Sequence, residues 1–367
     1  MGKKVRVGII GFGGIANAVH LPGYRGCQED AEIVAVCDID DKALQRAATA
    51  LGLPEDRLFK SYKDLIASDF VDAVDICTPN DVHCEIANEA IKAGKPFSVE
   101  KPIGLEYGEA LTLYENAQKA GVPSFVCFSW RYRQHTRYLK HLIDSGEIGK
   151  LHHIYIRCIK DSGLWEGRRL EWRFDKDKAG TGVLGDLGSH MIDITRFLGE
   201  EFVNVSADCG IIIDKRQKLD SDEIAEVTTD DWCNIIGRLK SNIGVTIALS
   251  RVATTIDDLI EFELFGEKGT IKFKYQWSPS GGVENSIEIC AGSIDTKGSG
   301  RHNITPPESF ASNQSKSFVD TVKGIIDPYA AQMTDGLECQ KVLDAALLSV
   351  KTGRTVNISE IGAEVNE

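Results

Sequence analysis

Two small groups of polar residues in this sequence have the types and spacing that proton transfer needs. Lys101 follows Glu100 and precedes Pro102 at the end of a short apolar run, and Asp186 stands four residues before His190. On a helix, residues four apart share a face, so the carboxylate could orient the imidazole and raise its basicity. A histidine that titrates near neutrality suits proton removal from a secondary alcohol. A lysine beside the same oxygen could stabilise alkoxide character.

Each group also has an ordinary structural interpretation. Glu100 and Lys101 would fit a solvated strand end. Asp186 and His190 would fit the polar side of an amphipathic helix. The run from Trp165 to Arg173 is similarly open to two interpretations: its tryptophans and arginines could face a sugar ring or a nicotinamide, or they could belong to the core and to a solvated loop.

A glycine-rich turn supplies a second kind of chemistry. The apolar segment from Val5 to Ile10 leads into Gly11-Phe12-Gly13-Gly14-Ile15-Ala16, which has the G-x-G-x-x-A spacing of a dinucleotide fingerprint. In such a turn the first glycine makes the bend, the second lets backbone approach a pyrophosphate, and the small residue lets the helix pack on the strand. Asp38 ends the next apolar segment and is placed to accept hydrogen bonds from a ribose.

The elements that must position these residues alternate between strand and helix up to about residue 129. The apolar segments end at Asp38, at Thr78-Pro79-Asn80 and at Glu100-Lys101, which predicts a parallel sheet with the candidate residues at the carboxyl ends of its strands. Beyond Trp130, strand-like runs follow one another with few helices between them. We therefore predict an α/β protein with a dinucleotide-binding domain over 1–129 and a second α/β domain over 130–367. The second domain would hold a large, mostly antiparallel open sheet, and the last helix could pack back on the first domain.

Composition narrows the class of protein. The 367 residues are 42% hydrophobic and 26% charged, with a net charge of −13, which argues against nucleic acid or an anionic membrane as a partner. Four glycines interrupt the apolar run from Val5 to Val19, and no stretch approaches the ~20 apolar residues of a membrane span, so we expect a cytoplasmic protein. The ten cysteines lack metal-finger spacing and are expected to be buried thiols, with no metal site.

The order of these motifs along the chain resembles the Gfo/Idh/MocA family of sugar and cyclitol dehydrogenases. The resemblance implies a Rossmann domain, a second domain whose open sheet mediates oligomerisation, and NAD- or NADP-dependent chemistry at a ring secondary alcohol. It implies that Lys101, Asp186 and His190 form the catalytic trio. The cofactor contacts that we carry over are Gly11, Phe12, Gly13, Gly14, Ile15, Ala16, Asp38, Ile39, Thr78, Pro79, Asn80, His83, Glu100, Lys101, Trp172 and Arg173. Besides the trio, Trp130 and Trp165 are expected at the substrate. Gly180-Thr181-Gly182 and Gln134 depart from the family pattern, which bears on substrate shape.

These expectations define a function with alternatives still open. We expect NAD as the cofactor, because Ile39-Asp40-Asp41 offers no cation for a 2′-phosphate. The substrate would be a neutral sugar, glycoside or cyclitol, and inositol is one specific candidate. Either His190 or Lys101 could be the final proton acceptor. A rival of another class is a glycosidase that oxidises its substrate transiently and re-reduces it, and a nucleotide sensor without turnover is a third. We expect a homo-oligomer: a dimer, tetramer or hexamer.

Overall fold

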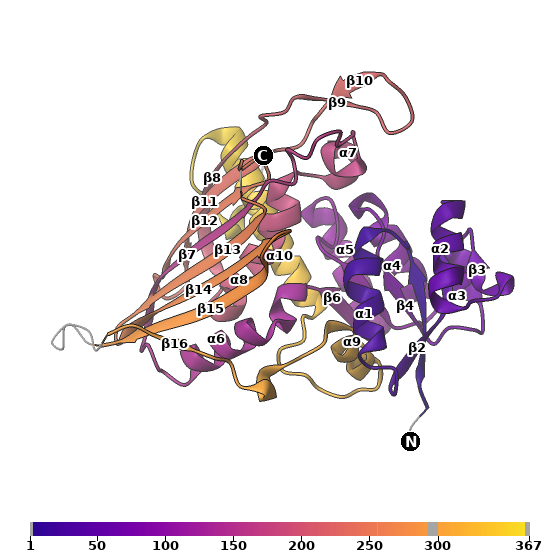
Figure 1. Ribbon diagram of the computed structural model, residues 1–367, viewed down its shortest axis with the longest axis horizontal. Helices are drawn as coiled ribbons and strands as arrows, with labels where there is room; N and C mark the ends of the chain where they lie inside the picture. Colours follow the sequence, from indigo (N-terminus) through magenta and orange to yellow (C-terminus); the bar gives the residue numbers. More distant parts are fainter. Residues whose placement is uncertain (1–2, 255, 293–299, 364–367) are drawn as a thin grey trace. The chain divides into compact units, whose positions relative to one another are not determined.

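The computed structural model describes residues 3–254, 256–292 and 300–363, and the chain divides into two compact units (Figure 1). The first unit combines Met1–Arg133 with Ser312–Glu338, and the second combines Gln134–Ala311 with Cys339–Glu367. The sequence alone suggested a single boundary between residues 129 and 130. In the structure the chain also returns to the first unit once, through the segment 312–338.

The first unit is built on a six-stranded parallel sheet with the order β3-β2-β1-β4-β5-β6. Its strands are β1 (Val5–Ile10), β2 (Ala31–Cys37), β3 (Leu58–Phe59), β4 (Ala73–Ile76), β5 (Phe97–Glu100) and β6 (Ser124–Cys127). Its helices are α1 (Leu21–Arg25), α2 (Asp41–Leu51), α3 (Tyr62–Ala67), α4 (His83–Lys92), α5 (Tyr107–Ala120) and α9 (Gln314–Val322). This strand order is that of a doubly wound dinucleotide-binding sheet, which confirms the predicted fold.

Local sequence signals account for the ends of these helices. Asp40 caps α2 by accepting a hydrogen bond of 3.0 Å from the backbone N–H of Lys42, and Ser61 caps α3 in the same way. Gly52 and Gly121 end α2 and α5 with φ angles of 67° and 63°, a left-handed conformation that glycine adopts without strain. The ends of these helices therefore follow from local residue types.

The returning segment completes the core of the first unit. Phe318 and Val319 of α9 are buried in the same apolar cluster as Phe125 and Tyr132, and the rings of Phe125 and Phe318 lie 5.9 Å apart. The backbone N–H of Val126 donates to the carbonyl of Ala331 at 3.1 Å. The core of the Rossmann unit is thus assembled from two distant parts of the sequence.

The second unit contains a nine-stranded sheet with the order β16-β15-β14-β13-β7-β12-β11-β8-β17, antiparallel except where β7 pairs with β12. The strands of this sheet are β7 (Leu151–Lys160), β8 (Phe202–Gly210), β11 (Trp232–Leu239), β12 (Gly244–Ser250), β13 (Asp258–Gly266), β14 (Gly269–Ser278), β15 (Gly282–Ala291), β16 (His302–Ile304) and β17 (Val356–Asn357). A separate hairpin joins β9 (Lys215–Gln217) to β10 (Ile224–Glu226).

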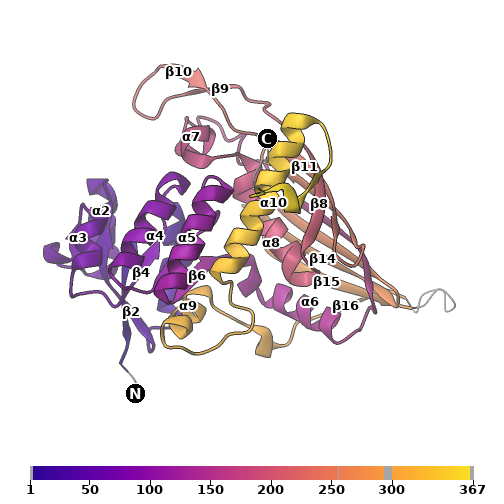
Figure 2. The same ribbon diagram turned by 180° about the vertical axis from the view of Figure 1, so that it is seen from behind.

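Helices lie along one face of this sheet. They include α6 (Gln134–Asp144), α8 (Ser189–Leu198) and α10 (Met333–Thr352), and Figure 2 shows α8 and α10 in front of the strands; the short α7 (Lys176–Ala179) lies near the hairpin. Residues of the strands alternate between buried and more exposed, as in β12. Burial on one face only explains the alternation in the sequence. Helix α10 begins in the first unit and ends in the second.

Two findings concern the cysteines and the membrane. A disulfide joins Cys209 of β8 to Cys233 of β11, which are directly opposite each other in the sheet. The prediction of thiols alone was wrong for this pair, because only the strand register brings two residues 24 positions apart together. The other eight cysteines are outside this disulfide and are buried or half-buried. Within the described ranges, no helix is both long enough and apolar enough to cross a membrane.

Candidate active site

The glycine-rich turn has a geometry that requires its first glycine. Gly11 has a φ of 89°, and a Cβ at this position would lie 2.8 Å from the carbonyl carbon of Cys77. Its N–H donates to the carbonyl of Cys37 at 2.8 Å, so the turn is held between β4 and β2. A side chain here would be both strained and sterically blocked.

The next residues form an open cradle at a helix start. Gly13 and Gly14 are exposed, and no atom of the described chain lies within 4 Å of where their Cβ atoms would be. The helix begins at Gly14, passes through a π-helical turn, Ala16–His20, and continues as α1. Ala16 is fully buried against the sheet. Because N–H groups in the first turn of a helix have no acceptor within it, this cradle fits a pyrophosphate.

Asp38 links the end of β2 to the same turn. One carboxylate oxygen accepts the N–H of Phe12 at 2.7 Å, and the other accepts the N–H of Asp40 at 2.8 Å. The neighbouring Ile39 is 90% exposed. Each carboxylate oxygen retains a second lone pair, so Asp38 can hold the turn and still accept a hydrogen bond from a ribose hydroxyl.

The loop after β4 offers a further polar atom. The hydroxyl Oγ1 of Thr78 is buried and makes no hydrogen bond within the described part of the chain. Pro79 follows it, and Asn80, which is buried, begins the short helical turn that leads into α4. A buried hydroxyl of this kind fits a ligand that supplies its partner.

His83 is placed differently from what the sequence suggested. Its ring is fully buried, with Nδ1 2.8 Å from the carbonyl oxygen of Pro102 and Nε2 2.9 Å from that of Thr78. Burial lowers the pKa of His83 more than these backbone contacts raise it. Because its two nitrogens contact backbone carbonyls, the His83 ring joins the loop after β4 to the loop after β5. The burial of this ring does not support the predicted direct contact with the cofactor.

The end of β5 carries Glu100 and Lys101. Glu100 is buried; its Oε1 lies 2.9 Å from Nε2 of His20, and its Oε2 accepts the N–H of Lys101 at 3.2 Å. The bond from Lys101 to Pro102 is cis. Lys101 itself is half-buried. Glu100 therefore acts as an internal support, and Lys101 is the residue at this strand end that can reach a ligand.

In the second unit, Arg173 connects two of the predicted residues. Its guanidinium lies over the ring of Trp172, 4.3 Å from the centroid, and its Nε is 4.0 Å from Oδ2 of Asp186. The exposed Trp165 donates from Nε1 to Asp161 at 3.0 Å. The structure thus brings Trp172, Arg173 and Asp186 together.

Asp186 and His190 lie on one continuous helix. Residues Leu184–Gly188 form a π-helical turn that continues directly into α8, and both Asp186 and His190 are half-buried. The start of this helix is capped by Asp230, a residue that the sequence did not single out. Its carboxylate accepts the N–H groups of Gly182 and Leu184 at 2.6 and 2.8 Å, and its carbonyl accepts that of Val183 at 3.0 Å.

The predicted site residues are divided between the two units. Lys101 and the fingerprint belong to the first unit, whereas Asp186, His190, Trp165, Trp172 and Arg173 belong to the second. Trp130, expected at the substrate, is 9% exposed, and the guanidinium of Arg133 lies 5.1 Å from its ring centroid. Little of the Trp130 ring is therefore available for a ligand.

Comparison with known proteins places this geometry in a family. An oxidoreductase family with an NAD-binding Rossmann fold matches residues 5–128, and the GFO/IDH/MocA C-terminal domain matches residues 136–272. Glucose-6-phosphate 3-dehydrogenase of Bacillus subtilis is 30% identical over 73% of this chain and 74% of its own length. The chain belongs to the GFO/IDH/MocA family.

Other GFO/IDH/MocA relatives extend the match over almost the whole chain. Inositol 2-dehydrogenase of Rhizobium meliloti is 28% identical over 97% of this chain and 99% of its own. The structure of a levoglucosan dehydrogenase in complex with NADH has a TM-score of 0.83 at 23% identity, covers 97% of this chain and 99% of its own, and shares the fold. The chain is therefore an NAD-binding oxidoreductase, which confirms the predicted fold class, enzyme class and cofactor.

Three supporting residues were missed by the sequence analysis: His20, Asp75 and Asp230. Asp75 had a visible signal, since it is a lone acid inside the apolar strand β4. His20 and Asp230 had none, because their partners lie 80 and 48 positions away in the sequence.

Proposed function

We propose that this protein oxidises, reversibly, a ring secondary hydroxyl of a neutral sugar, glycoside or cyclitol to the keto form, with NAD in preference to NADP. The observation that carries the proposal is the end of β5. There, Lys101 follows a buried, hydrogen-bonded glutamate, on the strand-end edge that also holds the glycine cradle, Asp38 and Thr78. In a sheet of this type, ligands bind at the carboxyl ends of the strands.

The roles of the chain's own residues follow from their chemistry. NAD, when bound, supplies the hydride acceptor. His190 accepts the hydroxyl proton, because an imidazole can take a proton near neutral pH. Lys101, as an ammonium group, donates a hydrogen bond to the same oxygen and stabilises alkoxide character. Asp186 orients the hydroxyl and the imidazole. Lys101 is the alternative proton acceptor.

A neutral substrate is supported by how the nearby cations are engaged. Arg173 faces Asp186, and Lys160 pairs with Asp258 at 3.0 Å. Arg169 donates to the backbone carbonyls of Lys218 and Ser221 at 2.8 and 3.1 Å. The charges of Arg173 and Lys160 are already matched by carboxylates, and the guanidinium of Arg169 is held by carbonyls, so a phosphate would have to compete for these groups. Among the relatives, the inositol 2-dehydrogenase fits this expectation better than the glucose-6-phosphate 3-dehydrogenase, and inositol stays one specific candidate beside the neutral sugars and glycosides.

The test is a screen of polyols, free sugars, glycosides and sugar phosphates for NADH formation at 340 nm, repeated with NADP. Net NADH formation with a neutral ring polyol supports the proposal. The alternative glycosidase would release sugar from a glycoside without accumulating NADH, so product analysis of the same reactions separates the two. The relatives described above are all named as dehydrogenases, which favours net oxidation.

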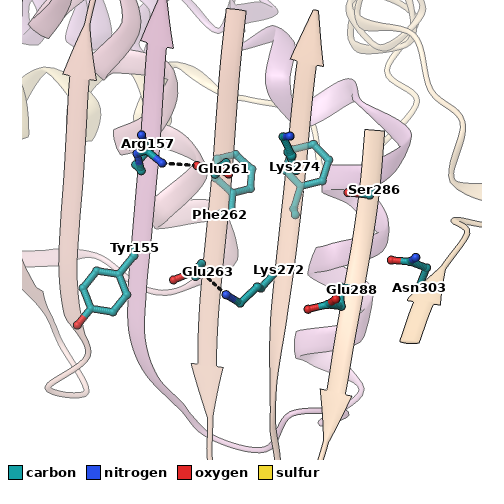
Figure 3. Close-up of a pocket in the computed structure, with 11 residues that line it drawn as sticks. Tyr155, Arg157, Glu261, Phe262, Glu263, Lys272, Lys274, Ser286, Glu288 and Asn303 are labelled. Carbon is teal, nitrogen blue, oxygen red and sulfur yellow. Dashed lines mark hydrogen bonds and ion pairs between the residues drawn. The ribbon is translucent and has the colours of Figure 1, made fainter. Parts of the chain in front are cut away.

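We also propose a homo-oligomer formed through the open face of the nine-stranded sheet. Residues of this sheet line a hollow of about 410 Å³. Figure 3 shows two ion pairs among the lining residues, Arg157 with Glu261 and Lys272 with Glu263. Tyr155, at the edge of the hollow, is 43% exposed. A self-complementary face of mixed charge and aromatic area suits contact with a second copy. The cytoplasmic location remains a prediction from the sequence.

A further inference from the structure

The parallel sheet of the first unit contains a buried charge at its centre. Asp75 is the third residue of the four-residue strand β4 and is 1% exposed. Its Oδ1 accepts the hydroxyl of Ser98 at 2.5 Å, and its Oδ2 accepts the hydroxyl of Tyr24 at 2.9 Å. A carboxylate at such a position is costly unless it is paired with a cation and hydrogen-bonded. The presence of this carboxylate inside an apolar strand therefore needs a structural or functional explanation.

The paired cation is His20, which lies between two carboxylates. Its Nδ1 is 2.7 Å from Oδ2 of Asp75, and its Nε2 is 2.9 Å from Oε1 of Glu100. A neutral imidazole donates from one nitrogen only, so two short contacts to carboxylate oxygens require the doubly protonated ring. Burial alone lowers the pKa of His20, but Asp75 and the neighbouring Cys77 raise it well above the ordinary value.

The same geometry explains an apparent metal-binding cluster. Donor atoms of His20, Asp75 and Cys127 lie within 4.8 Å of one another. An imidazolium has no lone pair for a metal ion, and burial beside Glu100 raises the pKa of the Cys127 thiol well above its usual range. Hydrogen bonds within the chain therefore account for this grouping.

The series of contacts from Asp75 through His20 and Glu100 ends at the backbone N–H of Lys101. Oε1 of Glu100 is held by His20, and Oε2 accepts the N–H of Lys101, so both oxygens of this carboxylate are fixed. His20 ends the π-helical turn that follows the glycine cradle, so one ring ties the cofactor-binding turn to the strand end that carries Lys101. We propose that His20 and Asp75 are positioning residues, which hold Lys101 in place through Glu100 without touching the substrate.

This inference rests on the proposed role of Lys101 and predicts how turnover responds to losing the buried cation. Without His20, the Glu100 carboxylate stays buried with one backbone N–H as partner, and it must protonate or turn away. Either change weakens the hydrogen bond that Oε2 accepts from the N–H of Lys101. Misplacement of a catalytic group by about 1 Å can lower kcat by about 100-fold. Because Glu100 is buried beneath the strand end, NAD binding at the glycine cradle should change little.

The test compares two pairs of variants in the full-length protein. His20→Gln and Asp75→Asn remove the cation or its anchor. Tyr24→Phe and Ser98→Ala each remove one hydrogen bond to Asp75 but leave the contact of His20 with Glu100 in place. All four are expected to lower the melting temperature. Only the first pair should lower kcat, by about 10- to 100-fold, with KM for NAD within about threefold of the wild type.

The outcomes are distinct. If kcat falls in all four variants in step with melting temperature, or if folded His20→Gln keeps normal kcat, the inference is wrong. If His20→Gln does not fold, two other measurements test the inference. Asp75→Asn preserves the shape of the side chain and should lower kcat. ¹⁵N NMR of the wild-type His20 ring should show a doubly protonated imidazole at pH 7, and a neutral ring overturns the inference. The Lys101→Ala variant separates a failure of the positioning inference from a failure of the proposed function. Normal turnover in that variant refutes the proposed function itself, whereas an inactive Lys101→Ala beside a normal His20→Gln refutes only the positioning role.

Discussion

At the scale of single residues, the proposed chemistry depends on one lysine and one histidine that belong to different units of the chain. Lys101 is anchored by the backbone contact with Glu100, and His190 by its place on the helix that Asp230 caps. The two groups can therefore be tested independently, because neither variant disturbs the support of the other.

Replacing His190 or Lys101 by alanine should lower kcat by about 100-fold or more, the usual scale for a positioned acid or base. Steady-state kinetics with the substrate identified by the screen measures this effect. NAD binding, followed by quenching of protein fluorescence, should survive in His190→Ala, since that residue is in the second unit. Near-normal turnover in His190→Ala would make Lys101 the leading base.

The Asp38 carboxylate should exclude the 2′-phosphate of NADP. We expect kcat/KM for NAD to exceed that for NADP by about 10-fold or more, because like charges at close range cost about 1.4 kcal/mol or more. Asp38→Asn keeps an oxygen for the N–H of Phe12 and removes the charge. It should therefore lower the ratio of kcat/KM for NAD to kcat/KM for NADP. An unchanged ratio, or a wild type that prefers NADP, would contradict this.

Residue types along the sequence were sufficient to predict the cofactor, because the fingerprint residues are local in sequence. The catalytic roles of Lys101, Asp186 and His190 stay predictions. Burial was not predictable in the same way. Glu100 and His83 read as cofactor contacts in the sequence, yet their partners, His20 and the carbonyl of Pro102, come from distant positions. Asp75 was visible as a lone acid inside an apolar strand, but its cation was not, because His20 is 55 residues away.

At the scale of elements, the turn before Asp186 leaves no room for a side chain. A Cβ on Gly182 would overlap the backbone carbonyl of Asp230, which cannot move without breaking the cap of the helix. Gly182→Ala should therefore lower the free energy of unfolding by about 1–3 kcal/mol and reduce kcat. Gly108→Ala, in the exposed first turn of α5, meets only Glu106 at 3.9 Å and should be neutral or stabilising by up to about 1 kcal/mol. Denaturant unfolding measures the free energy of unfolding of both variants. Equal losses in the two variants would contradict the steric role of Gly182.

An ion pair ties β1 to the start of β4. Arg6 donates to Asp72 from its side chain at 2.7 and 3.1 Å and from its backbone at 3.0 Å, and these contacts lower the pKa of Asp72 to about 2. Because the folded pKa lies below the unfolded value of about 3.9, this pair stabilises the fold above pH 4 and loses its contribution between about pH 4 and 2. Asp72→Asn should lower the free energy of unfolding at neutral pH. It should also make that free energy depend less on pH between about pH 4 and 2. Parallel stability–pH curves for both proteins would refute this.

The long strands of the second unit were predictable from alternation, and its strands of two or three residues were not. β9 and β10 have three residues each, which is too few to show a period-two pattern. The parallel pairing of β7 with β12 inside an otherwise antiparallel sheet is also invisible in the sequence, because it depends on how the chain crosses between distant strands.

At the scale of the whole molecule, the open sheet should control assembly. Light scattering at micromolar concentration should show a homo-oligomer, and Tyr155→Asp should weaken it by about 10-fold or more in Kd, because a charge would enter the contact. Tyr155→Phe preserves the ring and should leave assembly unchanged. A monomeric wild type, or equal behaviour of the two variants, would contradict the proposed interface.

The return of residues 312–338 to the first unit bears on how such a protein can be recombined. A fragment ending at Arg133 would lack Phe318 and Val319 and would leave the apolar surface around Phe125 uncovered. The Rossmann unit is thus not a module that one crossover can exchange. Any chimera must take both segments from the same parent, with a junction inside α10 near Glu338. Gene fusion and domain shuffling would therefore act on this chain as a whole, and new specificity would arise more readily by substitution in the loops of the second unit than by exchange of domains.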